Sequence, residues 1–291
     1  MGIPRGLSDR PLDPFGLDSF SQNLFGYNFI CLPGIVSLVF LQEHSMLQKS
    51  YTENLVIHSA AVDLTDTWRP SAILEAMQDA AVSHCVGLQL GRPELLPKGL
   101  AWVITRSEIV MDRLPRVNEH ITITTAPMPA RRFFFPRFYL FHDAEGKQIG
   151  KANSLWVLMD LETRHAVLPD AYIMEHYPDN SDLTAPMGNP GATDIVDAEP
   201  MEHLLTPQYT DIDANLHMNN VRYMDWACNA LGIETLRTHA MTHFIVNYNS
   251  EIRPGEVVRT VLQQKEGSFA FSGFAADDSR HFSISGDLMP R

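Results

Sequence analysis

Residues 213–231, DANLHMNNVRYMDWACNAL, place alternating polar side chains directly before an apolar helical pattern. In an extended chain Asp213, Asn215 and His217 point to one face, because strand side chains repeat every two residues. The apolar residues that follow recur at helical spacing, which predicts a largely buried helix over 219–231, closed by Gly232. The sequence therefore predicts a polar cluster beside a helix N-terminus, where free backbone N–H groups favour developing negative charge.

A purely structural interpretation of these residues competes with this one. Asn219 or Asn220 would cap the helix, Asp213 would end a strand, and His217 would be an ordinary surface residue. For a single residue that interpretation is the more common. Three polar residues in register before one helix favour chemistry instead.

The same order of elements occurs twice in the chain. Each half shows one strand, one helix and then a run of strands separated by turn residues, as in a sheet wrapped around a single helix. In the first half the helix is expected to begin at Pro70, and strands are expected over 55–62, 101–111, 120–127, 133–142 and 148–159. In the second half strands are expected over 204–210, 242–248, 256–264, 269–276 and 283–288. We therefore predict an α+β fold of two tandem domains with antiparallel sheets.

An alignment of the two halves at a spacing of 150 residues places Asp63, Thr65 and Thr67 at the positions of the polar cluster. A second match, PRVNEHI with IRPGEVV, places Leu114 near Glu251. The first half therefore keeps the scaffold but lacks the Asn, the His and the Glu.

Glu251 is the fourth candidate for the polar cluster. It follows the expected strand 242–248, where a carboxylate can project toward the neighbouring helix N-terminus. A carboxylate near a histidine can position and deprotonate water. The alternative is an exposed Glu at a strand end.

Length and composition exclude several classes of function. The chain has 291 residues, 45% of them apolar, which suits one large or two ordinary domains. The formal net charge of −13 argues against a nucleic-acid or anionic-membrane binder, because such a surface repels phosphate. Cys31, Cys85 and Cys228 are odd in number and far apart, so we expect no disulfide framework, no structural zinc site and a reducing cytoplasm.

The first 45 residues differ from the rest of the chain. They are rich in Pro and Gly without periodicity, and their apolar run over 27–41 is too short to span a bilayer comfortably and follows no basic leader. We expect 1–45 to be an extension outside the core, with Met46 as the start of the folded part. By composition, a first domain would span 46–165, a linker with little regular structure 166–205, and a second domain 206–291.

Several segments resemble the acyl-acyl carrier protein thioesterase family, the double-hotdog enzymes of bacteria and plant plastids. The most specific likeness lies in TDIDANLHMNNVRYMDW, followed by NYNSEIRPGEVV. WRPSAILEAMQDAAVSHC, GLAWVITRSEIVMDRLPRVNEHITITT and NSLWVLMDLETR are similar to that family's first hotdog domain. The resemblance covers about residues 50–290 and implies tandem hotdog domains, each an antiparallel sheet wrapped around a long central helix.

The resemblance implies hydrolysis of a fatty acyl thioester on acyl carrier protein, which releases free fatty acid and ends chain elongation. It implies a catalytic set of Asp213, Asn215, His217 and Glu251. Glu251 would activate water or attack directly, while Asp213 and His217 set its protonation and orientation. Asn215 and backbone N–H groups would hold the substrate carbonyl. Some family members carry a Cys after the Glu; Ile252 stands there in this chain, so a thiol mechanism is excluded at this site.

The resemblance also implies an apolar tunnel for the acyl chain in the first domain. Candidate tunnel residues, for which ordinary core is the alternative, are Met77, Ala80, Ala81, Trp102 and Val103.

The expected partner is acyl carrier protein bearing a phosphopantetheine-linked acyl chain. Carrier protein is acidic, so a basic patch around FFFP is the candidate docking site, with a solvated strand edge as the alternative. The patch comprises Arg131, Arg132 and Arg137, with Lys98 and Arg222 as candidate helpers. Tandem domains supply within one chain the pairing that single-domain relatives obtain by dimerising, so a monomer and a homodimer both fit.

Three other functions remain open on the sequence: an acyl-CoA thioesterase, an enoyl-thioester hydratase and a non-catalytic acyl-binding protein. The last is disfavoured because a binding module does not need four assembled polar groups. The sequence holds no Gly-x-Ser-x-Gly elbow, no Gly-rich phosphate loop and no dinucleotide fingerprint, so we expect no cofactor. His239 and His243 have the spacing of a helical metal pair but lie at an expected strand entry, so we assign no metal.

Overall fold

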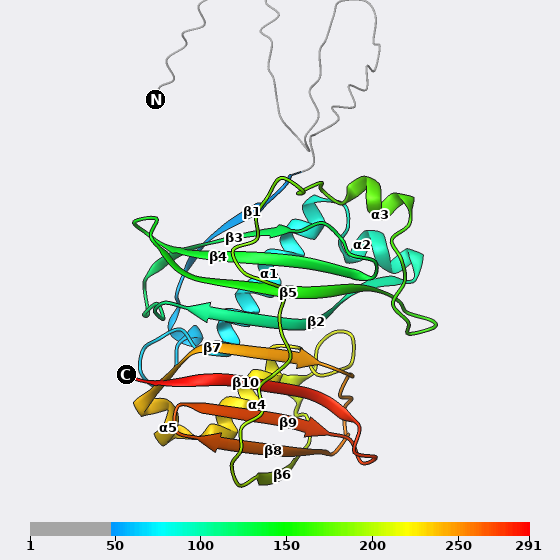
Figure 1. The fold of residues 1–291 in the computed structure, drawn as a ribbon. Helices are drawn as coiled ribbons and strands as arrows, with labels where there is room; N and C mark the ends of the chain where they lie inside the picture. Colours follow the sequence, from blue (N-terminus) through cyan, green and yellow to red (C-terminus); the bar gives the residue numbers. More distant parts are fainter. Residues whose placement is uncertain (1–47) are drawn as a thin grey trace, which may run out of the picture. The chain divides into compact units, whose positions relative to one another are not determined.

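The structure, a computed structural model, describes residues 48–291. The expected extension over 1–45, the proposed start at Met46 and Cys31 lie outside these residues. Ten strands form one antiparallel sheet in the order β1-β3-β4-β5-β2-β7-β10-β9-β8-β6 (Figure 1). The first half contributes β1 (Tyr51–Val56), β2 (Leu100–Met111), β3 (His120–Pro127), β4 (Phe134–Asp143) and β5 (Gln148–Asp160). The second half contributes β6 (Met201–Leu205), β7 (His239–Tyr248), β8 (Val258–Lys265), β9 (Ser268–Phe274) and β10 (Arg280–Pro290).

The strand order is symmetrical about the contact between β2 and β7. Each strand of the first half has a counterpart at the same distance on the other side of that contact, so β5 corresponds to β10. β2 and β7 pair antiparallel, with Arg106 opposite Asn247 and Val110 opposite His243. The predicted α+β fold of two tandem domains is therefore confirmed, and the two halves share a continuous sheet.

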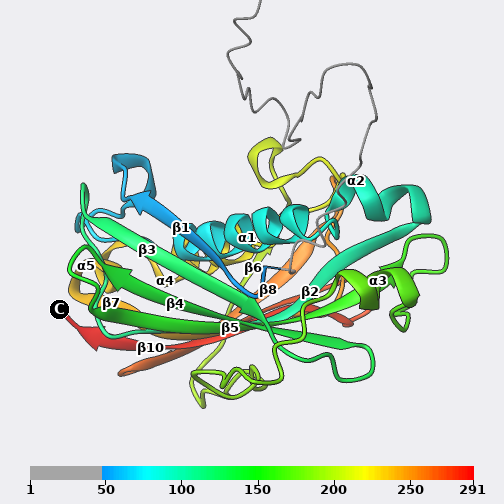
Figure 2. The same ribbon diagram turned by 90° about the horizontal axis from the view of Figure 1, so that it is seen from above.

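The main helix of each half lies on the same face of this sheet (Figure 2). α1 (Pro70–Gly87) begins at a proline, whose fixed φ suits the first turn, and buries Ile73, Leu74 and Met77. α4 (Arg222–Leu231) begins three residues later than predicted, because the Asn219 side chain accepts the Val221 N–H at 2.9 Å in a turn before the helix. Gly232, with φ 81°, ends α4 as predicted, and α5 (Ile233–Thr238) follows.

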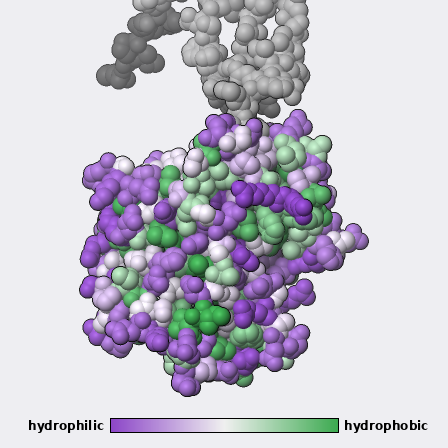
Figure 3. All heavy atoms as spheres, viewed as in Figure 1, coloured by the Kyte–Doolittle hydropathy of each residue, from purple (hydrophilic) through white to green (hydrophobic). Residues whose placement is uncertain are grey.

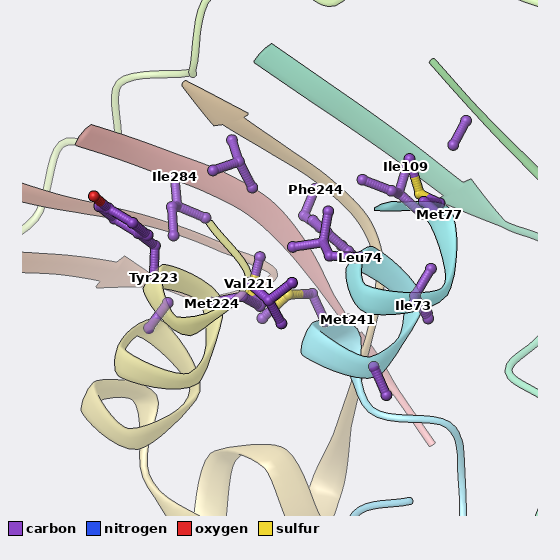
Figure 4. Close-up of a cluster of buried hydrophobic side chains, with 14 of the residues drawn as sticks. Ile73, Leu74, Met77, Ile109, Val221, Tyr223, Met224, Met241, Phe244 and Ile284 are labelled. Atoms are coloured by element: carbon purple, nitrogen blue, oxygen red, sulfur yellow. The ribbon is translucent and has the colours of Figure 1, made fainter. Parts of the chain in front are cut away.

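One hydrophobic core joins the two halves. Side chains of α1 and α4 pack between the helices and the sheet, where burying each large apolar side chain contributes about 1.5–3 kcal/mol. Figure 4 shows members of this core from α1, α4 and the central strands: Ile73, Leu74, Met77, Ile109, Val221, Tyr223, Met224, Met241, Phe244 and Ile284. A second, smaller cluster surrounds Leu90, Phe135 and Leu158 beyond the end of α1.

Three predictions about local structure were wrong. The strands expected over 55–62 and 204–210 end at Val56 and Leu205, and each continues into a short 3-10 turn, Ser59–Ala61 and Tyr209–Asp211. The segment expected to be an irregular linker contains α3 (Ala171–His176), capped by the Asp170 carboxylate, and it contains β6, which pairs with β8. The remaining short elements are α2 (Arg92–Leu95) and the 3-10 turn Leu96–Lys98.

The connection between the halves crosses the face of the sheet opposite the helices (Figures 1 and 2). Gly188 O accepts a hydrogen bond from the Asn153 side chain of β5, and the Thr193 hydroxyl lies 2.9 Å from that of Ser283 on β10. Figure 3 shows this side of the molecule as mostly hydrophilic with separate hydrophobic patches. The connection therefore pairs with polar side chains of the sheet and leaves the helix face to the core.

Candidate active site

Asp213, Asn215 and His217 lie in a tight turn before α4, not in an extended strand. The Asp213 N–H donates to His217 O at 3.0 Å, the Leu216 N–H donates to Asp213 O at 3.0 Å, and Leu216 adopts a left-handed φ of 61°. The prediction that strand alternation places the three side chains on one face is therefore wrong. The turn brings Asp213 and His217 together instead, because it closes between these two residues.

The Asp213 carboxylate organises this turn. Its Oδ1 accepts the Asn215 backbone N–H at 2.8 Å, and its Oδ2 accepts the Asn215 side-chain amide at 3.3 Å. Asn215 is exposed and reaches the cluster through Asp213. The amide of Asn215 is therefore held at the mouth of the site rather than inside it.

Glu251 joins the cluster through the backbone. The Met218 N–H donates to Ile252 O at 2.8 Å, which fixes the residue after His217 beside the residue after Glu251. His217 Nε2 then lies 3.6 Å from Glu251 Oε1, and its Nδ1 lies 3.8 Å from Asp213 Oδ1 and 3.4 Å from Met218 O. The imidazole stands between two carboxylates that are far apart in the sequence.

The geometry suits proton transfer to and from water. A proton on either nitrogen of His217 has a carboxylate oxygen within 4 Å. The side chains of Asp213, His217 and Glu251 are 20%, 24% and 30% exposed, so solvent and a substrate can reach them. These distances are longer than direct hydrogen bonds, as is common for catalytic groups before substrate binds.

Sequence reasoning missed Arg164. Its guanidinium forms an ion pair with Glu251 Oε1, the oxygen that faces His217. Arg164 follows β5 in the first half, whereas Glu251 follows β7 in the second. The basic side chain was visible in NSLWVLMDLETR, but only the three-dimensional arrangement shows which residue it meets.

The first half contains the same turn without the Asn, the His and the Glu. The Asp63 N–H donates to Thr67 O at 2.9 Å, the Asp66 N–H donates to Asp63 O at 3.1 Å, and Asp66 has a φ of 58°. The Trp68 N–H donates to Pro115 O at 2.8 Å, as Met218 does to Ile252. The alignment at a spacing of 150 residues is therefore confirmed bond by bond.

Leu114 takes the place of Glu251 in this first-half copy. It lines a cavity of about 190 Å³ together with Asp63 and Arg291. A leucine can neither accept a proton nor pair with a cation, so the first-half copy has no carboxylate at this position.

The structure divides the predicted tunnel residues between different places. Met77, Ala80 and Ala81 are buried in the main core, whereas Trp102 packs in the smaller cluster with Phe135 at a ring separation of 4.8 Å. Val103 follows Trp102 on β2 and therefore faces the opposite side of the sheet. The structure therefore separates Val103 from the other four, and their assignment to a tunnel stays a prediction. The cavity that Met77 lines has a volume of about 10 Å³.

Two of the three arginines of the predicted docking patch are exposed, and their role in docking stays a prediction. Arg131 and Arg132 are exposed at the turn before β4, beside Phe133 and Phe134, which are 39% and 46% exposed. Arg137 is only 6% exposed and is wrongly assigned to a docking surface. Side chains of a strand alternate between faces, and that of Arg137 points inward to α1, where it donates to His84 Nδ1 at 3.1 Å.

The two helper residues have other partners. Arg222 pairs with Asp225 at 2.8 Å, and the Lys98 ammonium lies 4.3 Å from the centre of the Tyr172 ring. His243 likewise contacts carboxylates, Glu108 at 3.2 Å and Asp287 at 2.9 Å. Within residues 48–291 no group of three or more His, Cys, Asp or Glu side chains is arranged to hold a metal ion. The same stretch has no helix with the length and apolar character that crossing a bilayer requires.

Comparisons with known proteins agree with the fold. The family model of the acyl-ACP thioesterase N-terminal domain matches residues 48–176, and that of the C-terminal domain matches residues 196–279. The chain therefore belongs to the acyl-ACP thioesterase family.

Curated relatives and solved structures extend this result. A chloroplastic acyl-acyl-carrier-protein hydrolase of Cuphea viscosissima is 26% identical over 75% of this chain and 56% of that protein. A chloroplastic palmitoyl-acyl carrier protein thioesterase of Gossypium hirsutum is 25% identical over 87% of this chain and 58% of that protein. The chain thus spans less than two thirds of the length of these relatives.

Two solved structures show the same fold. An acyl-ACP thioesterase from Bacteroides thetaiotaomicron superposes with a TM-score of 0.74 at 24% identity, covering 82% of this chain and 98% of that one. A 12:0-ACP thioesterase from Umbellularia californica superposes with a TM-score of 0.73 at 21% identity, covering 84% and 98%. The tandem hotdog fold predicted from the sequence is confirmed.

Proposed function

We propose that this protein hydrolyses fatty acyl thioesters carried on acyl carrier protein, releasing free fatty acid and ending chain elongation. One observation carries the proposal. The His217 imidazole stands between the carboxylates of Asp213 and Glu251, 3.8 and 3.6 Å away, at an accessible turn of the second half. The family membership and the names of the curated relatives support the same substrate class.

In the proposed reaction Glu251 and His217 take a proton from water, and the resulting hydroxide attacks the thioester carbonyl. The carbon–sulfur bond breaks, and the thiolate of the phosphopantetheine takes up the proton held on the pair. Asp213 orients His217, and the Asn215 amide stands at the mouth of the site to donate to the carbonyl oxygen as it gains charge. Direct attack by Glu251, with water then cleaving an anhydride, is the alternative version.

Comparison of three substrate classes tests the function. Purified protein is expected to release fatty acid from saturated acyl-acyl carrier protein faster than from acyl-CoA of the same chain length. Faster hydrolysis of the CoA ester would identify an acyl-CoA thioesterase. Hydration of an enoyl thioester with saturated thioesters left intact would identify a hydratase. Acyl binding without turnover would identify a binding protein and overturn the proposal.

Carrier-protein docking is proposed at Arg131 and Arg132, where two exposed arginines directly precede two exposed aromatic residues in a chain of net negative charge. The Arg131→Glu, Arg132→Glu double variant is expected to weaken carrier-protein affinity about tenfold, because exposed ion pairs contribute up to about 1 kcal/mol each. Calorimetric titration at low salt measures the affinity. The same charge change at the exposed Arg92 and Arg280 serves as the control, and equal weakening by both double variants would contradict docking at this turn.

Chain-length selection is proposed at Met77. An acyl tail needs far more room than the cavity of about 10 Å³ that Met77 lines, so the core around α1 must open when substrate binds. The Met77→Ala variant is expected to shift the released fatty acids toward longer chains, which gas chromatography of products would show. Met241→Ala removes an equally buried side chain that lines the first-half cavity instead, and it should leave the profile unchanged.

A cytoplasmic location and a monomeric or homodimeric state complete the proposal. Among the described residues Cys85 and Cys228 are free thiols, which suits a reducing compartment. The curated relatives are described as chloroplastic. The pairing of β2 with β7 supplies the contact between halves within one chain.

A further inference from the structure

We propose that Arg164 is a positioning residue for Glu251, supplied by the first half of the chain to the catalytic turn of the second half. This inference rests on the proposed function. Arg164 pairs with Glu251 Oε1, and that same oxygen faces His217 Nε2. A carboxylate on a flexible side chain would otherwise rotate freely. The guanidinium holds Oε1 against the imidazole and leaves Oε2 to receive the proton of the attacking water.

The backbone before Arg164 forms a hydrogen-bonded turn that fixes where its side chain starts. Asp160 Oδ1 accepts the Thr163 N–H at 2.7 Å, the Thr163 hydroxyl at 2.9 Å and the Glu162 N–H at 3.1 Å. These hydrogen bonds, that of the Thr163 N–H first, lower the pKa of Asp160 and keep it an acceptor. The Arg164 N–H donates to Asp160 O at 2.9 Å, which closes the turn. The position of Arg164 therefore comes from a defined turn.

Arg164 also carries backbone strain. Its φ of 59° is left-handed, a conformation that is unfavourable for a residue with a Cβ atom. Strained non-glycine residues persist where the surrounding structure fixes them, and they cluster at functional sites. A glycine would remove the strain but also the guanidinium, so the side chain accounts for an arginine at this position.

The symmetry of the sheet repeats the arrangement at the first-half turn. Arg291 follows β10 as Arg164 follows β5, and it reaches the turn of the other half. Its Nη2 lies 3.1 Å from Asp63 Oδ2, and its Nη1 donates to the Thr67 hydroxyl at 3.1 Å. Each half therefore supplies an arginine to the turn of its neighbour. Only at the second-half turn does that arginine meet a catalytic carboxylate.

The two arginines differ in how they are held. Arg291 also donates through Nε to Leu236 O and His239 O, each at 3.3 Å, and its side chain is 22% exposed. The Arg164 side chain is 45% exposed, and Glu251 is its carboxylate partner. Arg291 thus links the two halves through several contacts, whereas Arg164 contacts Glu251 and positions its carboxylate. This contrast provides a matched control within the chain.

The test compares Arg164→Met, Arg164→Lys and Arg291→Met in steady-state hydrolysis of acyl-acyl carrier protein by the full chain. Arg164→Met is expected to lower kcat about tenfold with little change in KM, because the glutamate loses its orientation but substrate binding does not. Arg164→Lys should recover part of the loss. Arg291→Met should keep kcat within about twofold while lowering Tm.

Three outcomes overturn the inference while leaving the proposed function intact. The first is an unchanged kcat in Arg164→Met. The second is a raised kcat in the same variant, which would make the ion pair inhibitory. The third is a loss of kcat in Arg291→Met equal to that in Arg164→Met. An inactive wild type overturns the proposed function instead. In that case the ion pair is tested by Tm in a double-mutant cycle. The double variant Arg164→Met, Glu251→Gln should lose less Tm than the two single variants lose in sum, and a loss equal to that sum overturns the pairing.

Discussion

Replacement of Glu251 by Gln, or of His217 by Ala, is expected to lower the turnover of acyl-acyl carrier protein about a hundredfold or more without unfolding the protein. Gln keeps the size of Glu251 but cannot accept the proton of water, and Ala removes the imidazole that faces Oε1 at 3.6 Å. Both side chains are partly exposed, so neither substitution opens a cavity in the core. Steady-state hydrolysis and thermal unfolding of the same preparations measure the two effects. Near-normal rates in both variants would overturn the assignment.

The repeated turn offers a matched control for this experiment. Asp213 and Asp63 occupy the same position in the two turns, and each accepts a backbone N–H two residues later at 2.8 Å. Asp213→Asn and Asp63→Asn therefore make the same chemical change in the same local structure. Only Asp213 lies beside a histidine, so only its variant should lose turnover. An equal loss in both variants would mean that the turns act through stability alone.

The fatty acids made by a host that expresses this protein report activity and chain length together. Wild type is expected to raise free fatty acids of a narrow range of chain lengths, and Glu251→Gln is expected to return the profile to that of the empty host. Gas chromatography of extracted lipids measures both. A rise of the same size with the Glu251→Gln variant would show that Glu251 is not needed for the activity.

The sequence predicted the parts of the site that depend on local pattern and repetition. Strand periodicity located the strands of the sheet to within about three residues, except at the ends of β1 and β6. The internal alignment makes Leu114 the equivalent of Glu251, and the matching hydrogen bonds of Trp68 and Met218 show why this prediction succeeded. Repeats carry three-dimensional information because equivalent residues make equivalent backbone contacts.

Other parts depend on contacts that no local pattern encodes. Asp213 and His217 lie close together because Leu216 adopts a left-handed φ. Leucine rarely adopts this conformation, so neither Leu216 nor its neighbours in the sequence predict it. A bulge in β2 between Ile104 and Arg106 reverses which side chains face α1. Arg164 reaches Glu251 across the contact between the halves. Each of these features requires the tertiary structure.

Acidification from pH 6.5 to about 4 is expected to remove about 3 kcal/mol of folding stability through His84. Burial, and then the neighbouring Arg137 guanidinium, lower the pKa of His84 from 6.5 to about 4, although its hydrogen bond with Gln48 O opposes this. His84 is fully buried, and its Nδ1 lies 3.1 Å from Arg137 Nη1. Arg137 can only donate, so Nδ1 accepts and the single ring proton sits on Nε2, 2.8 Å from Gln48 O.

The direction of the stability change with pH follows from the lowered pKa of His84. A histidine with a lowered pKa in the folded state favours the neutral form there, so the unfolded chain binds the extra proton first as pH falls. The contribution is therefore complete above about pH 6.5 and is lost progressively toward pH 4, where a second cation would stand beside Arg137. This loss comes from the buried His84 and the Arg137 guanidinium beside it.

His84→Gln separates this contribution from the protonation of carboxylates elsewhere. Glutamine keeps an acceptor for Arg137 and a donor for Gln48 O but does not titrate, so the unfolding free energy of the variant should fall about 3 kcal/mol less between pH 7 and 4 than that of wild type. Urea unfolding at several pH values measures both slopes. The same substitution at the exposed His58 controls for the change of residue type itself. Parallel curves for His84→Gln and wild type would show that the buried imidazole accepts a proton without cost, and the neutral pair with Arg137 would then be wrong.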